Sequence, residues 1–237
     1  AREEEERVEP TTQVLFGWLM FGGTHTLLSH PPIRDRLVAR LGDWGFVVLY
    51  SLVALATFVP LVWSFFENRV ATPIPLPVLV TIPGISWLTV LLMFVALNLM
   101  LLGFTSRNPV STLTGPASGD PGSGAVGALR ITRHPAFMGV ALAGLSHLLV
   151  NPAAIDRAFF GGMALYSVLG CAHQDWRRRR AGGPELAAFF AETSFLPFVA
   201  IARGRNRLVL GELRPIVLAA AGVAFLLLFF SHHKLFA

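Results

Sequence analysis

Residues 130–147 read RITRHPAFMGVALAGLSH, and this stretch decides how the rest of the chain is interpreted. Two arginines precede a His-Pro pair, and an apolar helix is predicted from Pro135 onward. Proline suits the first position of a helix, because the N–H that it lacks would have no helical partner there. His147 follows Pro135 by twelve residues, deep in the apolar segment. An ionisable side chain at membrane depth is costly, so His147 is a candidate functional residue.

The composition is that of a membrane protein. The chain has 237 residues, of which 54% are hydrophobic and 14% are charged, whereas soluble domains average about 25% charged residues. Several uncharged runs are long enough to cross a bilayer. The net charge is +5, and no nucleic-acid-binding motif accompanies it, so the arginines are interpreted as residues that orient the chain in the membrane. The single Cys171 excludes an internal disulfide framework.

We expect an all-α fold: a polytopic integral membrane helical bundle of about six transmembrane helices plus interfacial helices. The predicted spans are Gln13–Ser29, Phe46–Phe66, Ile85–Phe104, Pro135–Val150, Ala158–Ala172 and Pro215–Phe230. The predicted interfacial segments are Ile33–Gly42 and Pro184–Ala202, with a basic anchor over Trp176–Arg180. Connections rich in proline or glycine are expected over Ala71–Pro83 and Thr105–Gly127. Residues 1–11 form a surface tail, and residues 12–237 form one transmembrane domain.

Six spans predict a definite orientation. The connections on one side of the membrane hold 14 of the 19 Lys and Arg residues. By the positive-inside rule this side is cytoplasmic, and both termini lie outside the cytoplasm. We therefore expect an integral membrane protein of a bacterial inner membrane, with lipid as its surroundings.

Two of the seven histidines, His25 and His147, lie inside predicted spans. Small residues lie close to both: Gly22 precedes His25, and Ala143 and Gly144 precede His147. Such residues leave room for a bulky flat ligand held by a histidine, but they also let membrane helices pack closely, and both alternatives stay open. At roughly 1.5 Å per residue, the two histidines differ in depth by about 10 Å, which is compatible with a haem between the first and fourth spans. No His-x-x-x-His pair is present, so a zinc hydrolase is not expected.

His134 lies at the predicted cytoplasmic mouth, between Arg133 and Pro135. It could act on the polar head of a ligand, or it could stabilise the start of the helix. Arg133 could meet the propionates of a haem by charge-assisted pairing, although membrane anchoring explains the arginines as well.

Three segments together resemble the NnrU family. They are THTLLSHPPIRDRLVARLGDWGFVVLYSLVALATFVPLV from residue 24, GALRITRHPAFMGVALAGLSHLLVNP from residue 127, and SFLPFVAIARGRNRL from residue 194. The resemblance extends over about residues 14–236, and the ITRHP motif followed by a histidine within the helix is its most specific part. The family includes the plant and cyanobacterial 15-cis-zeta-carotene isomerase.

The resemblance implies an integral membrane haem b protein that isomerises the central double bond of an apolar polyene, such as 15-cis-zeta-carotene, without net redox change. It implies that His25 and His147 bind the haem iron and that His134 is the histidine of the RHP motif. Catalytic roles are expected for all three, and Gly22, Ala143, Gly144 and Arg133 are the expected cofactor neighbours. The isomerase branch carries a cysteine where this chain has Gly144, so that alternative thiol ligand is missing.

Three other functions stay open. The bacterial NnrU branch is associated with nitric oxide and denitrification, and the segments RNPVSTL and ARGRNRLVLGELR are closer to that branch. The RHP motif, with Asp175-Trp176-Arg177 and Phe195-Leu196-Pro197, also resembles isoprenylcysteine carboxyl methyltransferases, which use S-adenosylmethionine. Those enzymes carry a glutamate pair where this chain has Gln174-Asp175. A non-catalytic membrane subunit is the last alternative, because six spans and arginine-rich loops require no chemistry.

Overall fold

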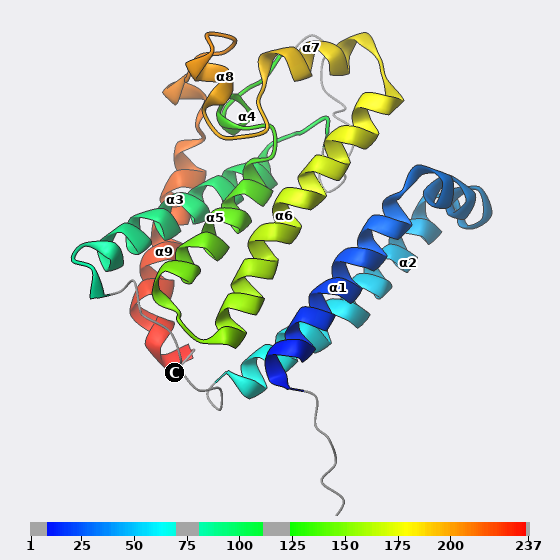
Figure 1. Ribbon diagram of the computed structural model, residues 1–237. Coiled ribbons are helices and arrows are strands. Elements are labelled where there is room, and N and C mark those ends of the chain that lie inside the picture. Colours follow the sequence, from blue (N-terminus) through cyan, green and yellow to red (C-terminus); the bar gives the residue numbers. More distant parts are fainter. Residues whose placement is uncertain (1–8, 70–80, 111–123, 236–237) are drawn as a thin grey trace, which may run out of the picture.

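The computed structural model describes residues 9–69, 81–110 and 124–235, with side chains described through residue 231 (Figure 1). Within these ranges the chain is helical and contains no strand, so the predicted all-α fold is confirmed there. The helices, in chain order, are α1 (Pro10–Ser29), α2 (Pro31–Asn68), α3 (Ile85–Thr105), α4 (Ala128–Ile131), α5 (Pro135–Val150), α6 (Ala154–Ala181), α7 (Pro184–Glu192), α8 (Val199–Ala202), the 3-10 helix η2 (Leu210–Glu212) and α9 (Pro215–Leu235). Most of the predicted connections Ala71–Pro83 and Thr105–Gly127 lies outside the described residues.

The first helix begins before the predicted end of the surface tail at residue 11. Pro10 takes the first helical position, and the Glu9 carboxylate accepts a hydrogen bond from the Thr12 N–H at 3.0 Å. This cap satisfies one of the N–H groups that a helix leaves unpaired at its start. The helix ends at His30, whose backbone is extended because it precedes Pro31.

The predicted interfacial helix Ile33–Gly42 and the predicted span Phe46–Phe66 both lie within α2, which is interrupted by a kink between them. Gly42 adopts φ 71° and ψ 171° inside α2. Glycine tolerates this positive φ, which a residue with a Cβ rarely adopts. The two predicted segments are therefore separate helical parts of α2, divided by the non-helical backbone at Gly42.

The structure adds detail to two predicted segments near the end of the chain. The predicted span Ala158–Ala172 and the predicted anchor Trp176–Arg180 lie in the single helix α6, whose last turn carries arginines that interact favourably with the helix dipole. The segment Pro184–Ala202 is not one helix, because α7 ends at Glu192 and an irregular stretch precedes α8. There the Ser194 hydroxyl accepts a hydrogen bond from the Ala200 N–H at 2.8 Å, a local bond that competes with continued helix.

Helix α6 lies at the centre of the molecule (Figure 1). It packs on one side against α1, which pairs with α2, and on the other side against α5, which also packs on α3. Helix α9 packs on α3, and α4, α7 and α8 gather at one end of the long helices. The approach of α3 to α5 depends on glycine: a Cβ at Gly103 would lie 2.2 Å from the Ala136 N, and one at Gly139 would lie 2.5 Å from the Ala96 O. Small residues at such crossings are typical of membrane helices.

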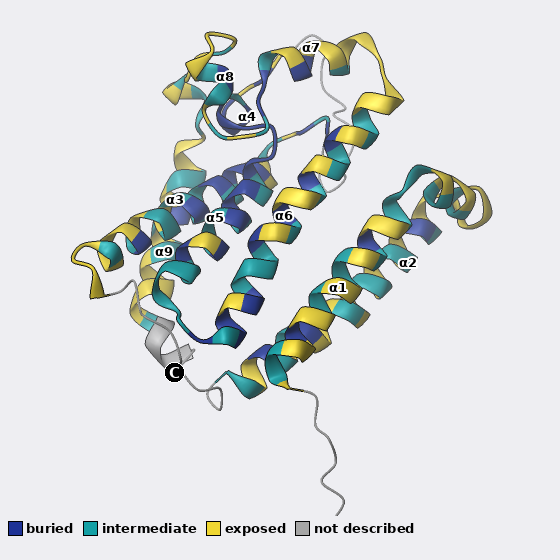
Figure 2. Cartoon of the chain, in the orientation of Figure 1, coloured by how far each residue is buried: buried dark blue, intermediate teal, exposed yellow. Residues whose placement is uncertain are grey.

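Buried residues concentrate on α5 and around α4, whereas α1, α2 and α9 expose long apolar faces (Figure 2). By length and composition, α2 and α3 are the described helices that could cross a membrane, while α5 and the part of α9 over Pro215–Ser231 are apolar but shorter. Only 11% and 22% of the most apolar windows of α2 and α3 are buried, unlike the core helices of a soluble protein. Two spanning helices are thus supported, and the predicted six spans remain a prediction.

Candidate functional site

His25 lies on α1 where this helix meets α2 and α6. Its imidazole is enclosed by aromatic rings, with ring centroids 4.1 Å from Phe21, 4.7 Å from Tyr50 and 6.0 Å from Tyr166. The side chain is buried, and its Nδ1 lies 2.9 Å from the Phe21 carbonyl oxygen. A carbonyl oxygen only accepts, so Nδ1 carries the proton and Nε2 carries the lone pair. Metal-binding histidines have this arrangement, in which the other ring nitrogen donates to a backbone carbonyl.

His147 lies near the C-terminal end of α5. Its contacts indicate the tautomer that has its proton on Nε2, unlike that of His25. The ring stacks on Phe160 of α6, with centroids 4.1 Å apart. The Asn151 Nδ2 lies 3.1 Å from the His147 Nδ1 and 2.9 Å from the His147 carbonyl oxygen. Because the carbonyl oxygen only accepts, that nitrogen is the amide donor, and the His147 Nδ1 is the acceptor. In the neutral ring the proton is therefore on Nε2, which removes that lone pair from metal binding.

The structure does not bring His25 and His147 together. Helix α6 lies between α1 and α5 (Figure 1). On α6, the Tyr166 that faces His25 follows the Phe160 that faces His147 by six residues, which is about 9 Å along the axis. The two histidines therefore contact different parts of α6. Their difference in depth and their binding of one iron stay predictions.

The small residues beside the two histidines serve helix packing. A Cβ at Gly144 would lie 2.6 Å from the Phe160 carbonyl oxygen, and one at Gly22 would lie 3.3 Å from the Tyr166 ring. Ala143, the neighbour of Gly144, is half-buried on the same helix. Of the two alternatives that the sequence left open, the close-packing one accounts for these positions.

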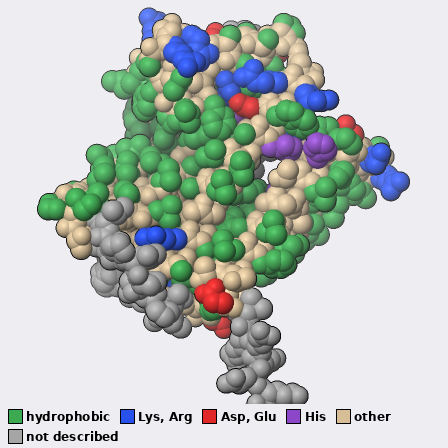
Figure 3. Space-filling view, viewed as in Figure 1, with side chains coloured by type: hydrophobic (Ala, Val, Ile, Leu, Met, Phe, Trp, Pro, Cys, Tyr) green, Lys and Arg blue, Asp and Glu red, His purple; other side chains and the backbone are tan. Residues whose placement is uncertain are grey.

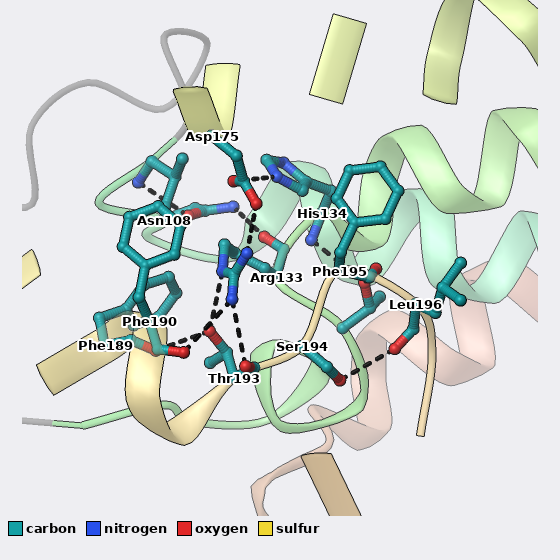
Figure 4. Close-up of polar contacts among 12 residues, drawn as sticks. Asn108, Arg133, His134, Asp175, Phe189, Phe190, Thr193, Ser194, Phe195 and Leu196 are labelled. Carbon is teal, nitrogen blue, oxygen red and sulfur yellow. Dashed lines mark hydrogen bonds and ion pairs between the residues drawn. The ribbon is translucent and has the colours of Figure 1, made fainter. Parts of the chain in front are cut away.

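His134 and Arg133 belong to a buried polar cluster at the start of α5 (Figure 4). Arg133 donates to one carboxylate oxygen of Asp175 on α6, and the His134 Nε2 lies 2.7 Å from the other. Arg133 is 3% exposed and His134 is 2% exposed. A buried charge is tolerated only when it is paired and hydrogen-bonded. His134 thus stabilises the start of α5, and Arg133 is engaged with protein groups instead of being open to a haem propionate.

Hydrogen bonds in the same cluster connect the segment after α7 to the RHP motif. The Arg133 Nε donates to the Thr193 hydroxyl at 3.0 Å, and the Arg133 N–H donates to the Ser194 carbonyl oxygen at 2.8 Å. The Thr132 hydroxyl donates to the Phe195 carbonyl oxygen at 2.7 Å. The Asn108 amide donates to the Arg133 carbonyl oxygen at 2.8 Å. Four separate parts of the chain therefore meet at this cluster (Figure 4).

The two basic members of the cluster were predicted as site residues, but their binding partners were not. Asp175 directly precedes the predicted basic anchor Trp176–Arg180 in the same helix, and it was named only for the resemblance to methyltransferases. One signal was available, because a carboxylate next to an apolar helix needs a cationic partner and Arg133 is such a partner. The backbone carbonyls of residues 193–195 leave no signal in the sequence.

The described residues contain no group of three or more His, Cys, Asp or Glu side chains that could hold a metal ion. A comparison with protein-family models matches residues 13–237 to the family described as NnrU protein. The chain matches no curated protein and no solved structure.

Proposed function

This chain belongs to the NnrU family, and from that premise we propose that it is an integral membrane protein that binds haem b through His25 and isomerises an apolar polyene. The family match extends over nearly the whole chain, so the proposal applies to the domain as a unit. The observation that carries the haem part is the His25 imidazole, whose Nδ1 is held by the Phe21 carbonyl and whose ring is surrounded by aromatic side chains.

The membrane part of the proposal is supported by the apolar surface. Large aromatic side chains point outward on the long helices: Trp44 is 83% exposed, Trp63 is 69% exposed and Trp87 is 77% exposed. Figure 3 shows hydrophobic side chains over most of the visible face, with Lys and Arg at its ends. Such a surface is unfavourable in water and favourable in lipid.

His25 is the residue that would hold the haem, because the hydrogen bond from its Nδ1 to the Phe21 carbonyl leaves the Nε2 lone pair available. A bound haem would supply an iron that can pass electron density into a polyene and weaken its central double bond. The protein's part is to hold the His25 ring in one tautomer and to keep water from it. The Phe21 carbonyl holds the tautomer, and the rings of Tyr50 and Tyr166 help to keep water away.

An apolar groove on α2 provides a route for a polyene. It has a volume of about 500 Å³ and is lined by Phe58, Val62 and Trp63 among others, which is within the size range of ligand pockets. The Phe58 ring lies 5.0 Å from the Phe21 ring, which in turn contacts His25. The Phe21 ring therefore contacts both the groove and His25. A polyene dissolved in the bilayer could enter the groove from the side.

Absorption spectra test the haem part. The protein is expressed with haem supplied, purified in detergent, and compared in oxidised and reduced form with His25→Ala and His147→Ala. We expect a Soret band in the wild type and in His147→Ala, and its loss in His25→Ala. A colourless wild type would contradict haem binding, and equal loss in both variants would mean that the two histidines share one iron in a rearranged chain. Conversion of 15-cis-zeta-carotene, measured by chromatography, then tests the isomerase.

One observation favours a second candidate, a haem protein that binds nitric oxide. This observation is the His25 imidazole, whose Nδ1 is held by the Phe21 carbonyl, and a haem bound there would supply iron chemistry for a diatomic ligand. A spectral shift with nitric oxide, together with no conversion of the polyene, would favour this function. The methyltransferase alternative has less support, because Arg133 and His134 of the RHP motif are buried and engaged with Asp175.

A further inference from the structure

A polar cavity of about 440 Å³ lies beside α4, at the end of the molecule that carries α7 and α8. Arg130, Glu192, Asn206 and Arg207 contribute to its lining, and they come from three separate segments of the chain. Figure 3 shows arginine side chains gathered at this end. We infer that this cavity binds the headgroup of an aminophospholipid, with the phosphate at Asn206 and Arg207 and the amine at Glu192.

The positive charge that is available in the cavity comes from the loop that carries Arg205 and Arg207. Arg130 is already engaged, because its Nε and one terminal nitrogen donate to Glu212 and the other terminal nitrogen donates to the Asn206 Oδ1 at 2.8 Å. Arg205 and Arg207 also line the cavity, and neither takes part in an ion pair of the described residues. Guanidinium groups in such a position suit a phosphate oxygen.

Asn206 provides an independent sign that a hydrogen-bond acceptor belongs here. Its Oδ1 accepts from Arg130 and, at 2.7 Å, from the Arg207 N–H, which fixes the orientation of the amide. Its Nδ2 is buried and has no hydrogen-bond partner among the described residues. Leaving a buried donor unpaired is costly, so buried polar atoms nearly always have a partner. Asn206 lines the cavity, so a phosphate oxygen that reached this buried nitrogen would supply the missing acceptor.

Glu192 adds a negative charge to a site that otherwise carries positive charges. One of its carboxylate oxygens, Oε2, accepts a hydrogen bond from the Ala125 N–H at 2.9 Å. No ion pair within the described part of the chain uses this carboxylate. A purely anionic ligand would meet repulsion from it. A phosphoethanolamine group carries a primary ammonium that donates to Glu192, whereas the quaternary ammonium of phosphocholine has no N–H to donate.

The surroundings of the cavity favour a lipid over a free phosphate ester. Val126 is part of the lining and is 47% exposed, and Leu208 and Leu210 beside the arginines are 42% and 70% exposed. Helix α9 begins a few residues later, where Ile216 is 80% exposed. Apolar side chains around a charged cavity match the acyl chains and the headgroup of one lipid molecule.

Lipid retention measured by native mass spectrometry tests the inference. The full chain, purified in detergent, is mixed with phosphatidylethanolamine, phosphatidylglycerol or phosphatidylcholine. We expect phosphatidylethanolamine to be retained about tenfold better than the other two, the effect of one charge-assisted hydrogen bond. Arg207→Gln should lose retention of all three lipids, and Glu192→Gln should lose only the preference for phosphatidylethanolamine.

Arg203→Gln is the matched control, because it removes the same charge from the same loop at a residue that does not line the cavity. Equal retention of the three lipids, or equal losses in Arg207→Gln and Arg203→Gln, would overturn the inference. If free glycerophosphoethanolamine displaces the lipid at equal concentration, the ligand is a soluble ester and the lipid assignment is wrong. Arg207 is exposed, so its variant is expected to fold, which gel filtration and thermal unfolding check.

Discussion

Asp175 holds two basic residues at once, so its removal should be the most damaging single change in the buried cluster. Without this carboxylate, Arg133 keeps a positive charge at 3% exposure and has only neutral partners. Removing one member of a buried ion pair costs about 3–5 kcal/mol. We therefore expect Asp175→Asn to lower the free energy of unfolding by that amount, as measured by thermal unfolding in detergent.

The control for this prediction is Asp35→Asn. The Asp35 carboxylate lies 3.7 Å from Arg34, and its side chain is 72% exposed. Exposed pairs contribute roughly 0–1 kcal/mol, so this variant should unfold close to the wild type. If Asp175→Asn and Asp35→Asn unfolded alike, the buried cluster would not be a main source of stability.

Glu212 gives a prediction about pH. The hydrogen bond from Arg130, followed by that from the Gly127 N–H, lowers the pKa of Glu212 from an ordinary 4.5 to about 2. A carboxylate with a lowered pKa in the folded state stabilises the fold above the unfolded pKa, and the contribution is lost as the pH falls through the folded pKa. Glu212 is partly exposed, so the contribution is of the order of 1 kcal/mol.

We expect Glu212→Gln to be less stable than the wild type at pH 7 and to approach it as the pH falls from 4.5 toward 2. Thermal unfolding of both proteins across this range checks the trend. A difference in stability that stays constant from pH 7 to pH 2 would mean that the carboxylate charge is not what stabilises this loop.

The histidines show how much of the candidate site could be predicted from single residues. Position in the apolar segments was enough to single out His25 and His147, but their tautomers depend on the Phe21 carbonyl and on Asn151. Local sequence does not reveal which side of α6 each histidine faces. For His134, the sequence left two roles open, and Asp175, a partner 41 residues away, accounts for the stabilising one.

At the scale of elements, glycines decide how closely α3 and α5 approach. A Cβ at Gly139 would lie 2.5 Å from the Ala96 carbonyl oxygen, and one at Gly103 would lie 2.2 Å from the Ala136 N. Both obstacles are backbone, which cannot rotate away. We expect Gly139→Ala and Gly103→Ala to lower the free energy of unfolding by about 1–3 kcal/mol, the cost of overpacking.

Gly161→Ala on α6 is the matched control, because a Cβ there would meet nothing within 4 Å. Thermal unfolding of the three variants should leave Gly161→Ala unchanged or slightly more stable, since alanine favours helix over glycine. Equal stability of all three variants would show that α3 and α5 can separate without cost.

The helix starts at Pro135, Pro184 and Pro215 were predicted, whereas α1 and α2 begin at Pro10 and Pro31, a few residues before the predicted starts. Pro31, Pro135, Pro184 and Pro215 each begin a helix or lie at its first positions, as expected from the φ angle of proline. The end of α7 was not predicted, because it depends on Thr193 and Ser194 accepting hydrogen bonds from the distant Arg133. Such tertiary contacts override the helical preference of the segment Pro184–Ala202.

At the scale of the whole molecule, the charge distribution agrees with one orientation. The turn between α1 and α2 lies at the end of α6 that carries its arginines, since His30 stacks on Trp176 with ring centroids 5.4 Å apart. Helices α4, α7 and α8 gather at this end as well (Figure 1). Positively charged connections stay in the cytoplasm during insertion, so this end should be cytoplasmic.

Labelling of single cysteines tests this orientation and the crossing of α5, which at 16 residues is shorter than the roughly 20 residues that usually span a bilayer. The native Cys171 is buried and should give little background. With a membrane-impermeant maleimide added to intact cells, Ile82→Cys and Pro152→Cys should be labelled, and Arg180→Cys should be labelled only after the membrane is opened. If Pro152→Cys behaved like Arg180→Cys, α5 would not cross, and the number of spans would fall below six. The opposite pattern at all three positions would reverse the orientation, and the arginine-rich end would then lie outside.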